Sequence, residues 1–264
     1  MSTRTSRWPA GIPCWTDLSV PDVDAAVAFY GSVLGWDFAD TGEDYGGYRI
    51  ATVRDAAVAG IGPQMGGGPP AWTLYLASDD VDATTTAVTE HGGTLLMPPG
   101  DVGPMGRMAI AADPSGAVFG IWQAGEMIGA SLVNEPGGMT WEDLRSTEPA
   151  AAQDFYRALF GYRLDPVEMA GPDYGTFSLP GEQAPLGGMG PMMGNPEGTP
   201  SHWLVYFGVS STDAAVEAAQ AAGGSVLMPA MDSPFGRLAV VADPAGAGFC
   251  VIETDANRQP DRAG

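Results

Sequence analysis

An internal duplication limits how this chain can fold more than any other feature of its sequence. Three sequence blocks each occur twice, at separations of 126 to 131 positions. For example, WTDLSVPDVDAAVAFYGSVLGWDF returns as WEDLRSTEPAAAQDFYRALFGYRL without a gap. The matched ranges are 15–38 with 141–164, 72–98 with 203–229, and 106–122 with 236–252. Because self-similarity at a fixed spacing marks a repeated structural unit, the sequence predicts two similar domains, at 10–124 and 137–254.

Within each copy the same order of elements is predicted twice. A strand that begins near a tryptophan is followed by a helix and then by three short strands separated by Gly-rich turns. Asp22 is the expected N-cap of the first helix and Gly35 its expected C-cap. The whole chain is therefore predicted to form four β-α-β-β-β units in an α+β fold.

The charge composition limits the partners that the chain can bind. With 11 basic and 32 acidic residues the formal net charge is −21, and all the cations are arginine. Such a surface repels phosphate backbones, so we expect no nucleic acid partner. No run of about 18 apolar residues and no signal-peptide pattern is visible, which predicts a cytoplasmic protein without a membrane partner. Cys14 and Cys250 lie in apolar runs without a CxxC neighbour, which favours buried reduced thiols over a zinc site.

The repeated motifs also resemble those of a known superfamily. PDVDAAVAFYGSVLG, the DDVDA helix that ends at a Gly-Gly pair, and the GR segment followed by DPSGAVF are similar to glyoxalase/bleomycin resistance/extradiol dioxygenase proteins, the vicinal oxygen chelate superfamily. The WxDL start and the duplicated layout resemble its tandem two-domain actinobacterial members. The resemblance implies two glyoxalase/bleomycin-resistance domains whose strands form open curled sheets around cavities. It also implies that catalytic members hold a divalent metal through His, Glu or Gln on the inner face.

The positions at which the resemblance places those metal ligands carry other residue types here. In the first copy they are Trp15, Thr73, Gly120 and a position near Ala59; in the second they are Trp141, Leu204, Cys250 and a position near Leu186. None of these residues completes a carboxylate or imidazole set, so we predict no metal and no cofactor.

Large aromatic residues stand where the ligands would be. Strand alternation places Trp15 with Asp17, and Trp141 with Asp143, on the face that the resemblance assigns to the cavity. An aromatic plane beside a carboxylate suits a flat small molecule, although the rings could instead fill the cavity. The candidate ligand-binding residues are Trp15, Asp17, Tyr48, Thr73, Tyr75, Trp122, Trp141, Asp143, Tyr174, His202, Tyr206 and Cys250.

Asp17 and Asp143 need partners if they point inward, because a buried unpaired carboxylate is unfavourable. Arg107 and Arg237, each in a Gly-Arg step before a strand, are the expected cations, and such pairs would make the aspartates structural. An aspartate without a cation would instead have a raised pKa and suit proton transfer. These four residues are the candidate catalytic set.

Several functions remain open at this point. The first is a metal-free binding protein that sequesters a flat apolar or aromatic metabolite or antibiotic. The second is a metal-independent enzyme of secondary metabolism, an isomerase, a lyase or an oxygenase-like catalyst, with Asp17 or Asp143 as acid or base. A metal-dependent glyoxalase or dioxygenase and an inactive scaffold are less favoured. All of these functions except the inactive scaffold imply a small-molecule partner. We expect the chain to be a monomer or a homodimer.

Overall fold

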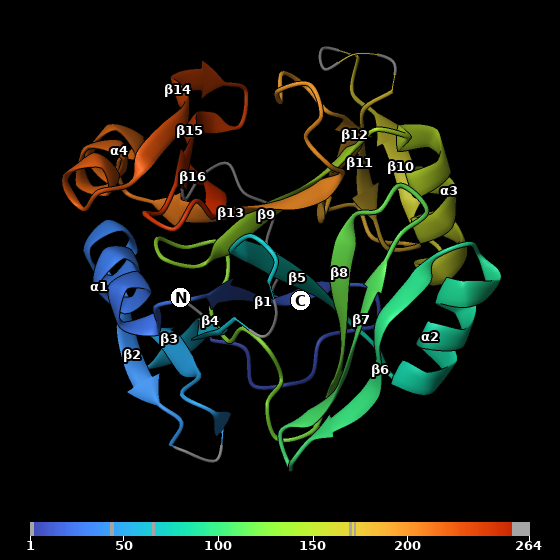
Figure 1. The fold of residues 1–264 in the computed structure, drawn as a ribbon. Helices are drawn as coiled ribbons and strands as arrows, with labels where there is room; N and C mark the ends of the chain where they lie inside the picture. The colour runs from blue at the N-terminus through green and yellow to red at the C-terminus, as the bar shows by residue number, and fades with distance from the viewer. Residues whose placement is uncertain (1–2, 43–44, 65–66, 169–170, 172, 255–264) are drawn as a thin grey trace.

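The computed structural model describes residues 3–42, 45–64, 67–168, 171 and 173–254 (Figure 1). The first half of the chain contains two helices and eight strands in the described residues. They are β1 (Pro13–Val20), α1 (Val23–Leu34), β2 (Asp37–Asp40), β3 (Arg49–Val53), β4 (Ala56–Pro63), β5 (Ala71–Ala77), α2 (Val81–Glu90), β6 (Thr94–Val102), β7 (Gly106–Ala112) and β8 (Val118–Ala124).

The second half repeats this order in the part of the chain that the structure describes. Its elements are β9 (Met139–Ser146), α3 (Pro149–Phe160), β10 (Arg163–Pro166), β11 (Gly175–Ser178), β12 (Gly187–Pro191), β13 (His202–Val209), α4 (Thr212–Ala221), β14 (Ser225–Ser233), β15 (Gly236–Ala242) and β16 (Gly248–Glu253). The four predicted β-α-β-β-β units and the α+β class are thereby confirmed. The predicted caps of α1 are also present: Asp22 accepts a hydrogen bond from the Ala25 amide, and Gly35 is left-handed.

The two units of each half combine into one eight-stranded sheet. The strand order of the first sheet is β2-β3-β4-β1-β5-β8-β7-β6, and the second sheet has the equivalent order β10-β11-β12-β9-β13-β16-β15-β14. The units meet where β1 pairs antiparallel with β5, and β9 with β13. Each sheet curls without closing into a barrel (Figure 1).

Strand alternation gives each sheet two different faces. In β1, Leu18 points into the hydrophobic core and is 1% exposed, whereas Asp17 and Ser19 point to the other face and are partly exposed. Phe29 and Tyr30 of α1 pack on the core face. On the other face of the first sheet, Trp15 and Tyr75 still belong to this core, whereas the other face of the second sheet carries a separate small cluster around Tyr206 and Cys250.

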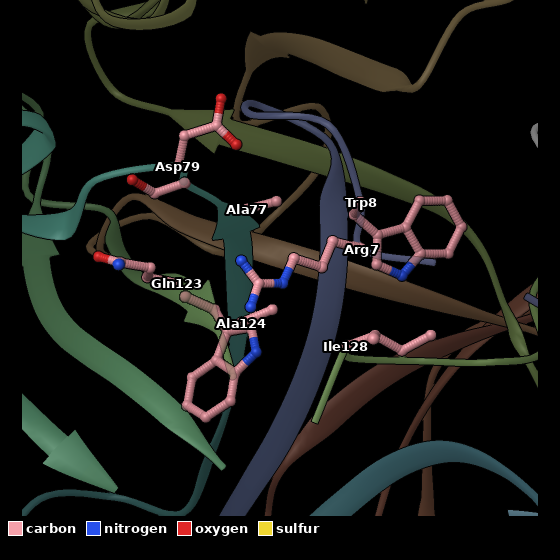
Figure 2. A pocket seen from close by; sticks show the side chains of 9 residues that line it. Arg7, Trp8, Ala77, Asp79, Gln123, Ala124 and Ile128 are labelled. Carbon is pink, nitrogen blue, oxygen red and sulfur yellow. The ribbon is translucent and has the colours of Figure 1, made fainter. Parts of the chain in front are cut away.

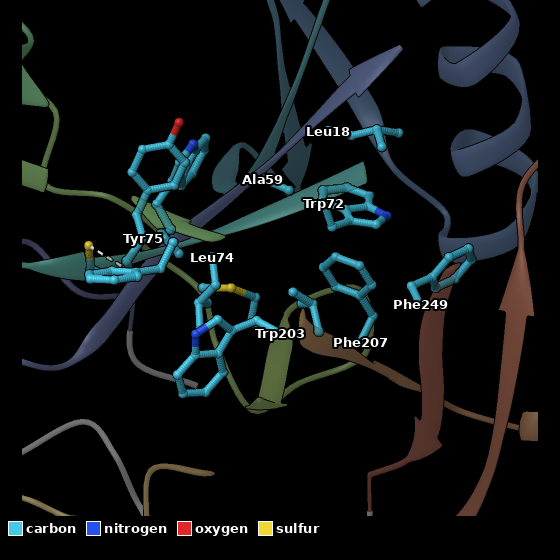
Figure 3. Close-up of a cluster of buried hydrophobic side chains, with 14 of the residues drawn as sticks. Leu18, Ala59, Trp72, Leu74, Tyr75, Trp203, Phe207 and Phe249 are labelled. Carbon is cyan, nitrogen blue, oxygen red and sulfur yellow. Dashed lines mark hydrogen bonds between the residues drawn. The ribbon is translucent and has the colours of Figure 1, made fainter. Parts of the chain in front are cut away.

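One continuous hydrophobic core joins the two domains. The rings of Trp72 and Phe207, from β5 and β13, lie with their centroids 5.1 Å apart (Figure 3). The ring of Trp36 also contacts that of Phe207, with the centroids 5.1 Å apart. Helix α1 of the first domain lies beside α4 of the second, and α2 beside α3 (Figure 1). The domains therefore form a single packed unit.

A reciprocal hydrogen-bond arrangement crosses this interface and uses the repeated motifs. The Tyr30 hydroxyl donates to Oδ2 of Asp243 at 3.2 Å and accepts from Nε1 of Trp72 at 3.1 Å. In the equivalent arrangement Tyr156 accepts from Nε1 of Trp203 at 3.0 Å, and its hydroxyl faces the Asp113 carboxyl. The residues that correspond between the two domains are Tyr30 and Tyr156, Trp72 and Trp203, and Asp113 and Asp243. The Phe-Tyr and Asp-Pro motifs thus bind each domain to the other.

Candidate functional site

In the first domain, four chemically distinctive side chains gather on the outer face of the sheet. We call Trp15, Asp17, Tyr48 and Tyr75 the Asp17 group. Trp15 and Asp17 come from β1, and their register partners on β5 are Tyr75 and Thr73. Because directly paired residues share a face, Tyr75 lies beside Trp15 and reaches Asp17 diagonally. Tyr48 precedes β3 in a turn.

Both tyrosine hydroxyls of the Asp17 group are directed at the carboxyl. The Tyr75 hydroxyl donates to Oδ2 of Asp17 at 3.0 Å. The Tyr48 hydroxyl accepts from Nε1 of Trp15 at 3.0 Å and is hydrogen-bonded to Asp17. Burial, followed by the charge of Asp17, raises the pKa of both phenols, so both remain protonated donors at neutral pH.

Glycines make room for the two tyrosine rings. A Cβ atom on Gly60 would lie 1.7 Å from the Tyr48 hydroxyl oxygen, and one on Gly62 would lie 2.9 Å from the Tyr48 ring. A Cβ on Gly120 would lie 2.1 Å from the ring of Tyr75. Since Gly60 is the register partner of Asp17 on β4, the tyrosine crosses the bare strand to reach the carboxyl.

The environment of Asp17 favours its neutral form. Desolvation by the surrounding aromatic residues raises the pKa of the Asp17 carboxyl to about 7, against the smaller opposing effect of the Tyr75 and Tyr48 hydrogen bonds. Among the described residues, no charged side chain contributes to this shift. At neutral pH Asp17 therefore exists in both protonation states.

The second domain carries an equivalent set that is bonded differently. We call Trp141, Asp143, Arg145, Tyr174 and Tyr206 the Asp143 group. Oδ1 of Asp143 accepts from Trp141 at 2.9 Å and from Tyr174 at 2.8 Å. Oδ2 accepts from Tyr206 at 2.7 Å and from Arg145 at 2.6 Å. With four donors, Asp143 is 3% exposed and fully paired.

The Arg145 guanidinium is the main chemical difference between the Asp17 group and the Asp143 group. Burial opposes its charge, but Asp143, Tyr206 and Tyr174 more than offset that effect and raise the pKa of Arg145. The equivalent position in the first domain is Ser19, which cannot supply a cation. Asp143 therefore belongs to a buried ion pair, whereas Asp17 does not.

Apolar side chains adjoin both groups. On the face of the Asp17 group they include Ile50, Met108 and Ile110, which are partly exposed, and Met97, which is 39% exposed. In the second domain a separate hydrophobic cluster of Tyr206, Cys250 and Ile252 packs with Trp141, Leu204, Leu238 and Val240. The exposed ring of Phe235 stacks on Trp141, with centroids 6.1 Å apart. The second face differs from the first in this stacked pair, in which Trp141 is partly exposed and Phe235 is 57% exposed.

The prediction that Arg107 and Arg237 pair with Asp17 and Asp143 is wrong. Arg107 pairs with Asp82 at 2.5 Å and with Asp101 at 2.9 Å. Arg237 makes the equivalent pairs with Asp213 and Asp232. Strand alternation is the reason. Arg107 and Arg237 each precede by one residue the position that faces the aspartate group, so their side chains point to the opposite face of the sheet, where α2 and α4 lie.

Trp122 lies on the same face of the sheet, as the register partner of Met108, and makes contacts of its own there. Its indole Nε1 donates to the Met127 carbonyl at 2.9 Å, and the ring lines a cavity of about 40 Å³. Arg7 and Trp8 of the N-terminal segment form another wall of this cavity, beside Ala77 and Asp79 (Figure 2). The chain segment before β1 covers the end of β8, and Trp122 packs against it rather than with the Asp17 group.

The remaining sequence candidates border the two groups. Thr73 is the register partner of Asp17 and is partly exposed. His202 is the register partner of Arg145; its Nδ1 lies 2.9 Å from the Pro200 carbonyl, and burial lowers the pKa of its imidazole. Cys250 is the buried register partner of Tyr206, and burial raises the pKa of its thiol. Cys250 thus stands where the first domain has Gly120.

The donor set at this face does not fit a divalent metal. In the described part of the chain, no group of three or more His, Cys, Asp or Glu side chains is placed to hold an ion. Asp143 already accepts four hydrogen bonds, and its neighbours in the group are donors. The position expected near Ala59 falls on the core face, since Ala59 is fully buried; Gly60 faces Asp17 instead.

Arg145 and the glycines that seat the tyrosines were not identified from the sequence. Arg145 follows Trp141 and Asp143 in steps of two, so alternation alone places it on the same face. The glycine pair Gly60 and Gly62 recurs as Gly188 and Gly190 around Tyr174, at a separation of 128. This repeated spacing of glycines is the sequence pattern that indicates a strand with room for a tyrosine ring.

Four β-α-β-β-β units paired into two curled sheets define a tandem protein of the vicinal oxygen chelate class. The chain belongs to the Glyoxalase/Bleomycin resistance protein/Dioxygenase superfamily: that family's model matches residues 14–121, and a glyoxalase-like domain model matches residues 140–252. The described residues contain no helix long and apolar enough to cross a bilayer.

Similar proteins match almost the whole chain. CFP32 of Mycobacterium tuberculosis is 42% identical, over 95% of this chain and 97% of its own length. The anthracycline biosynthesis protein DnrV of Streptomyces peucetius is 37% identical, over 94% and 95%. The fold is also that of the 2,3-dioxygenase LapB from Pseudomonas sp. KL28 (TM-score 0.66, 15% identity, 97% of this chain and 96% of that one). The Mn(II)-bound glyoxalase from Novosphingobium aromaticivorans has a TM-score of 0.65 at 15% identity, over 96% and 87%.

Proposed function

We propose that the first domain binds a flat, apolar or aromatic small molecule on the face that carries the Asp17 group. The observation behind this proposal is the composition of that face. Met97, Met108 and Ile110 offer partly exposed apolar surface, one partly exposed carboxyl lies among them, and the rings of Trp15 and Tyr75, each 4% exposed, pack beneath this surface. Few polar groups within a largely apolar lining are typical of sites for small organic molecules.

The second domain supports the proposal by contrast. Its carboxylate is neutralised by Arg145 and fully hydrogen-bonded, and the ring of Phe235 stacks on that of Trp141. The first domain therefore binds the ligand, and the second supports the fold. The name of the relative DnrV, an anthracycline biosynthesis protein, agrees with a role beside small organic molecules. No metal takes part in the proposed binding, because the face lacks a fitting donor set.

Titration with planar aromatic compounds tests this proposal. Calorimetry and tryptophan fluorescence are measured for the wild type and for the matched variants Trp15→Ala and Trp141→Ala. We expect the first variant to weaken binding at least tenfold, because it removes ring surface from the site, and the second to leave the dissociation constant nearly unchanged. Equal losses in both variants, or no binding of any planar compound by the folded wild type, would contradict the proposal.

A metal-independent enzyme is the second candidate function, favoured by the half-ionised state of Asp17. A carboxyl with a pKa of about 7 is suited to accept and return a proton at neutral pH. In the simplest such step a C–H bond beside a carbonyl breaks, its proton passes to the carboxylate, and the electron pair moves onto the carbonyl oxygen as an enolate. Hydrogen–deuterium exchange of 2-tetralone, followed by NMR, tests this step. Exchange that is equally fast with wild type and Asp17→Asn would exclude Asp17 as the base.

A further inference from the structure

The hydrogen bonds of the Asp17 group fix where the protons of the two tyrosines lie. Trp15 Nε1 donates to the Tyr48 hydroxyl oxygen, so the Tyr48 proton is available for Asp17. Tyr75 donates its own proton to Oδ2 of Asp17. Both tyrosines are therefore donors toward the carboxyl. When Asp17 is protonated, its own acid proton is not needed by either hydroxyl and is available to a ligand.

The groups that face Asp17 from the neighbouring strands are all uncharged at neutral pH. On β5 they are Thr73 and Tyr75, and on β4 the register partner is Gly60. Tyr48 approaches over β4, and Ser19 follows on β1 itself. Within the described residues, the titratable groups among these are the two tyrosines, whose phenols are neutral over the whole range in which Asp17 titrates.

We infer that the ligand of the first domain carries a carbonyl oxygen on its ring system, and that the protonated Asp17 donates a hydrogen bond to this oxygen. The inference rests on the proposed function, because it specifies the class of molecule bound at the same face. A carbonyl oxygen accepts and cannot donate, which complements a carboxyl whose own proton is free while Tyr75 and Tyr48 donate theirs to it.

A flat hydrocarbon of the same shape would lose this hydrogen bond. It would cover the acid group without pairing it, and an unpaired polar group in an apolar contact opposes binding. The preference for the carbonyl compound is expected to be about tenfold or more at low pH. Above pH 7 the ionised Asp17 has no proton to donate and repels the carbonyl dipole, so the preference decreases.

The pair 9-fluorenone and fluorene tests the inference, since the two compounds differ by one carbonyl oxygen on the same planar tricycle. Dissociation constants are measured at pH 5.5 and pH 8.5 for wild type, Asp17→Asn and the exposed control Asp24→Asn. For the wild type and the control we expect fluorenone to bind about tenfold or more tightly at pH 5.5, with a smaller preference at pH 8.5. In Asp17→Asn the amide oxygen can accept from the tyrosines while its NH₂ donates, so the preference is expected at both pH values.

The outcomes separate this inference from the proposed function. If both compounds bind equally at pH 5.5, the flat-ligand proposal stands and the carbonyl inference is overturned. If neither compound binds, the inference is overturned, and the proposed function fails with it when the folded wild type also binds no other planar compound. A preference in folded Asp17→Asn that still decreases between pH 5.5 and pH 8.5 also overturns the inference, because another group would then be the donor. The wild-type comparison holds even if the variant does not fold.

Discussion

Nη2 of Arg145 lies 2.6 Å from Oδ2 of Asp143, whereas the residue equivalent to Arg145 in the other domain is Ser19. This one difference separates two otherwise similar sets of aspartate, tyrosine and tryptophan. In the second domain the carboxylate is part of a buried, fully hydrogen-bonded ion pair. In the first domain the carboxyl is held by phenols alone and is neutral over part of the accessible pH range. The duplicated chain thus carries one ion-paired aspartate and one without a cation.

The raised pKa of Asp17 predicts how stability depends on pH. A carboxyl whose pKa is about 7 in the folded state and about 4 in the unfolded state stabilises the fold in its protonated form. That contribution is complete below pH 4 and is lost as the pH rises through 7. Asp17→Asn cannot ionise, so its free energy of unfolding relative to wild type should increase by about 1–3 kcal/mol between pH 4.5 and pH 8.

Urea unfolding at several pH values measures this difference. The control Asp24→Asn changes an exposed carboxyl on α1 and should follow the wild type at every pH. A difference between Asp17→Asn and wild type that does not change with pH would show that Asp17 has an ordinary pKa.

Replacing Arg145 by serine gives the second domain the residue of the first. Asp143 would keep the hydrogen bonds from its three neutral donors but would lose the guanidinium that balances its charge. The Asp143 carboxylate is only 3% exposed, so water cannot replace that cation. Because breaking a buried ion pair leaves an uncompensated charge, we expect the free energy of unfolding to fall by about 2–4 kcal/mol at pH 8.

The exposed pair between Arg157 and Asp154 supplies the comparison for that experiment. Arg157→Ser removes a surface ion pair on α3 and should cost less than about 1 kcal/mol under the same conditions. If Arg145→Ser is no more damaging than Arg157→Ser, the buried pair does not hold the second site together.

Most of the fold could be predicted from the sequence, because the duplication and the strand periodicity are both local patterns. Alternation within β1 correctly separates Leu18 from Asp17, and the helix caps at Asp22 and Gly35 follow from local backbone chemistry. The partner of Asp143 was not predicted, although Arg145 lies only two residues away on the same strand. The sequence predicts the cation at the Gly-Arg steps, but Arg107 and Arg237 stand one residue out of phase with the face that carries the aspartates.

Other parts of the site depend on packing that is not local in sequence. Tyr48 lies in a turn, where no strand period fixes its direction, and it reaches Asp17 only because Gly60 and Gly62 leave β4 bare. Trp122 lines a cavity together with Arg7 and Trp8 of the N-terminal segment. Neither contact follows from the residues that adjoin it in the chain.

The seat of Tyr48 on β4 gives a further prediction. A Cβ at residue 60 would lie 1.7 Å from the Tyr48 hydroxyl oxygen, so Gly60→Ala must displace that side chain from Asp17 and Trp15. We expect affinity for planar ligands to fall about tenfold and stability to fall by about 1–3 kcal/mol, because buried polar groups lose their partner. Gly67→Ala, where an added Cβ meets no atom within 4 Å, should change neither quantity. Unchanged ligand affinity in folded Gly60→Ala would show that Tyr48 does not take part in the site.

The tyrosines at the domain interface lead to a prediction about cooperativity. Tyr30 and Tyr156 each lie fully buried between the domains and each accept a hydrogen bond from a tryptophan of their own domain. Tyr30→Phe leaves Trp72 and the opposing Asp243 without that hydroxyl, and should lower the free energy of unfolding by about 1–3 kcal/mol.

Unfolding of Tyr30→Phe, Tyr156→Phe and the double variant, followed by calorimetry and by near-ultraviolet circular dichroism, distinguishes two descriptions of the interface. If the continuous core alone joins the domains, each single variant should still unfold in one transition, since Trp72, Phe207 and their neighbours remain packed. If the two hydroxyl arrangements are also needed for coupling, the double variant should unfold in two transitions. We expect one transition in the single variants and two in the double variant, because losing both hydroxyls leaves polar groups unpaired at both ends of the shared core. A single transition in the double variant would show that hydrophobic packing is sufficient to couple the domains.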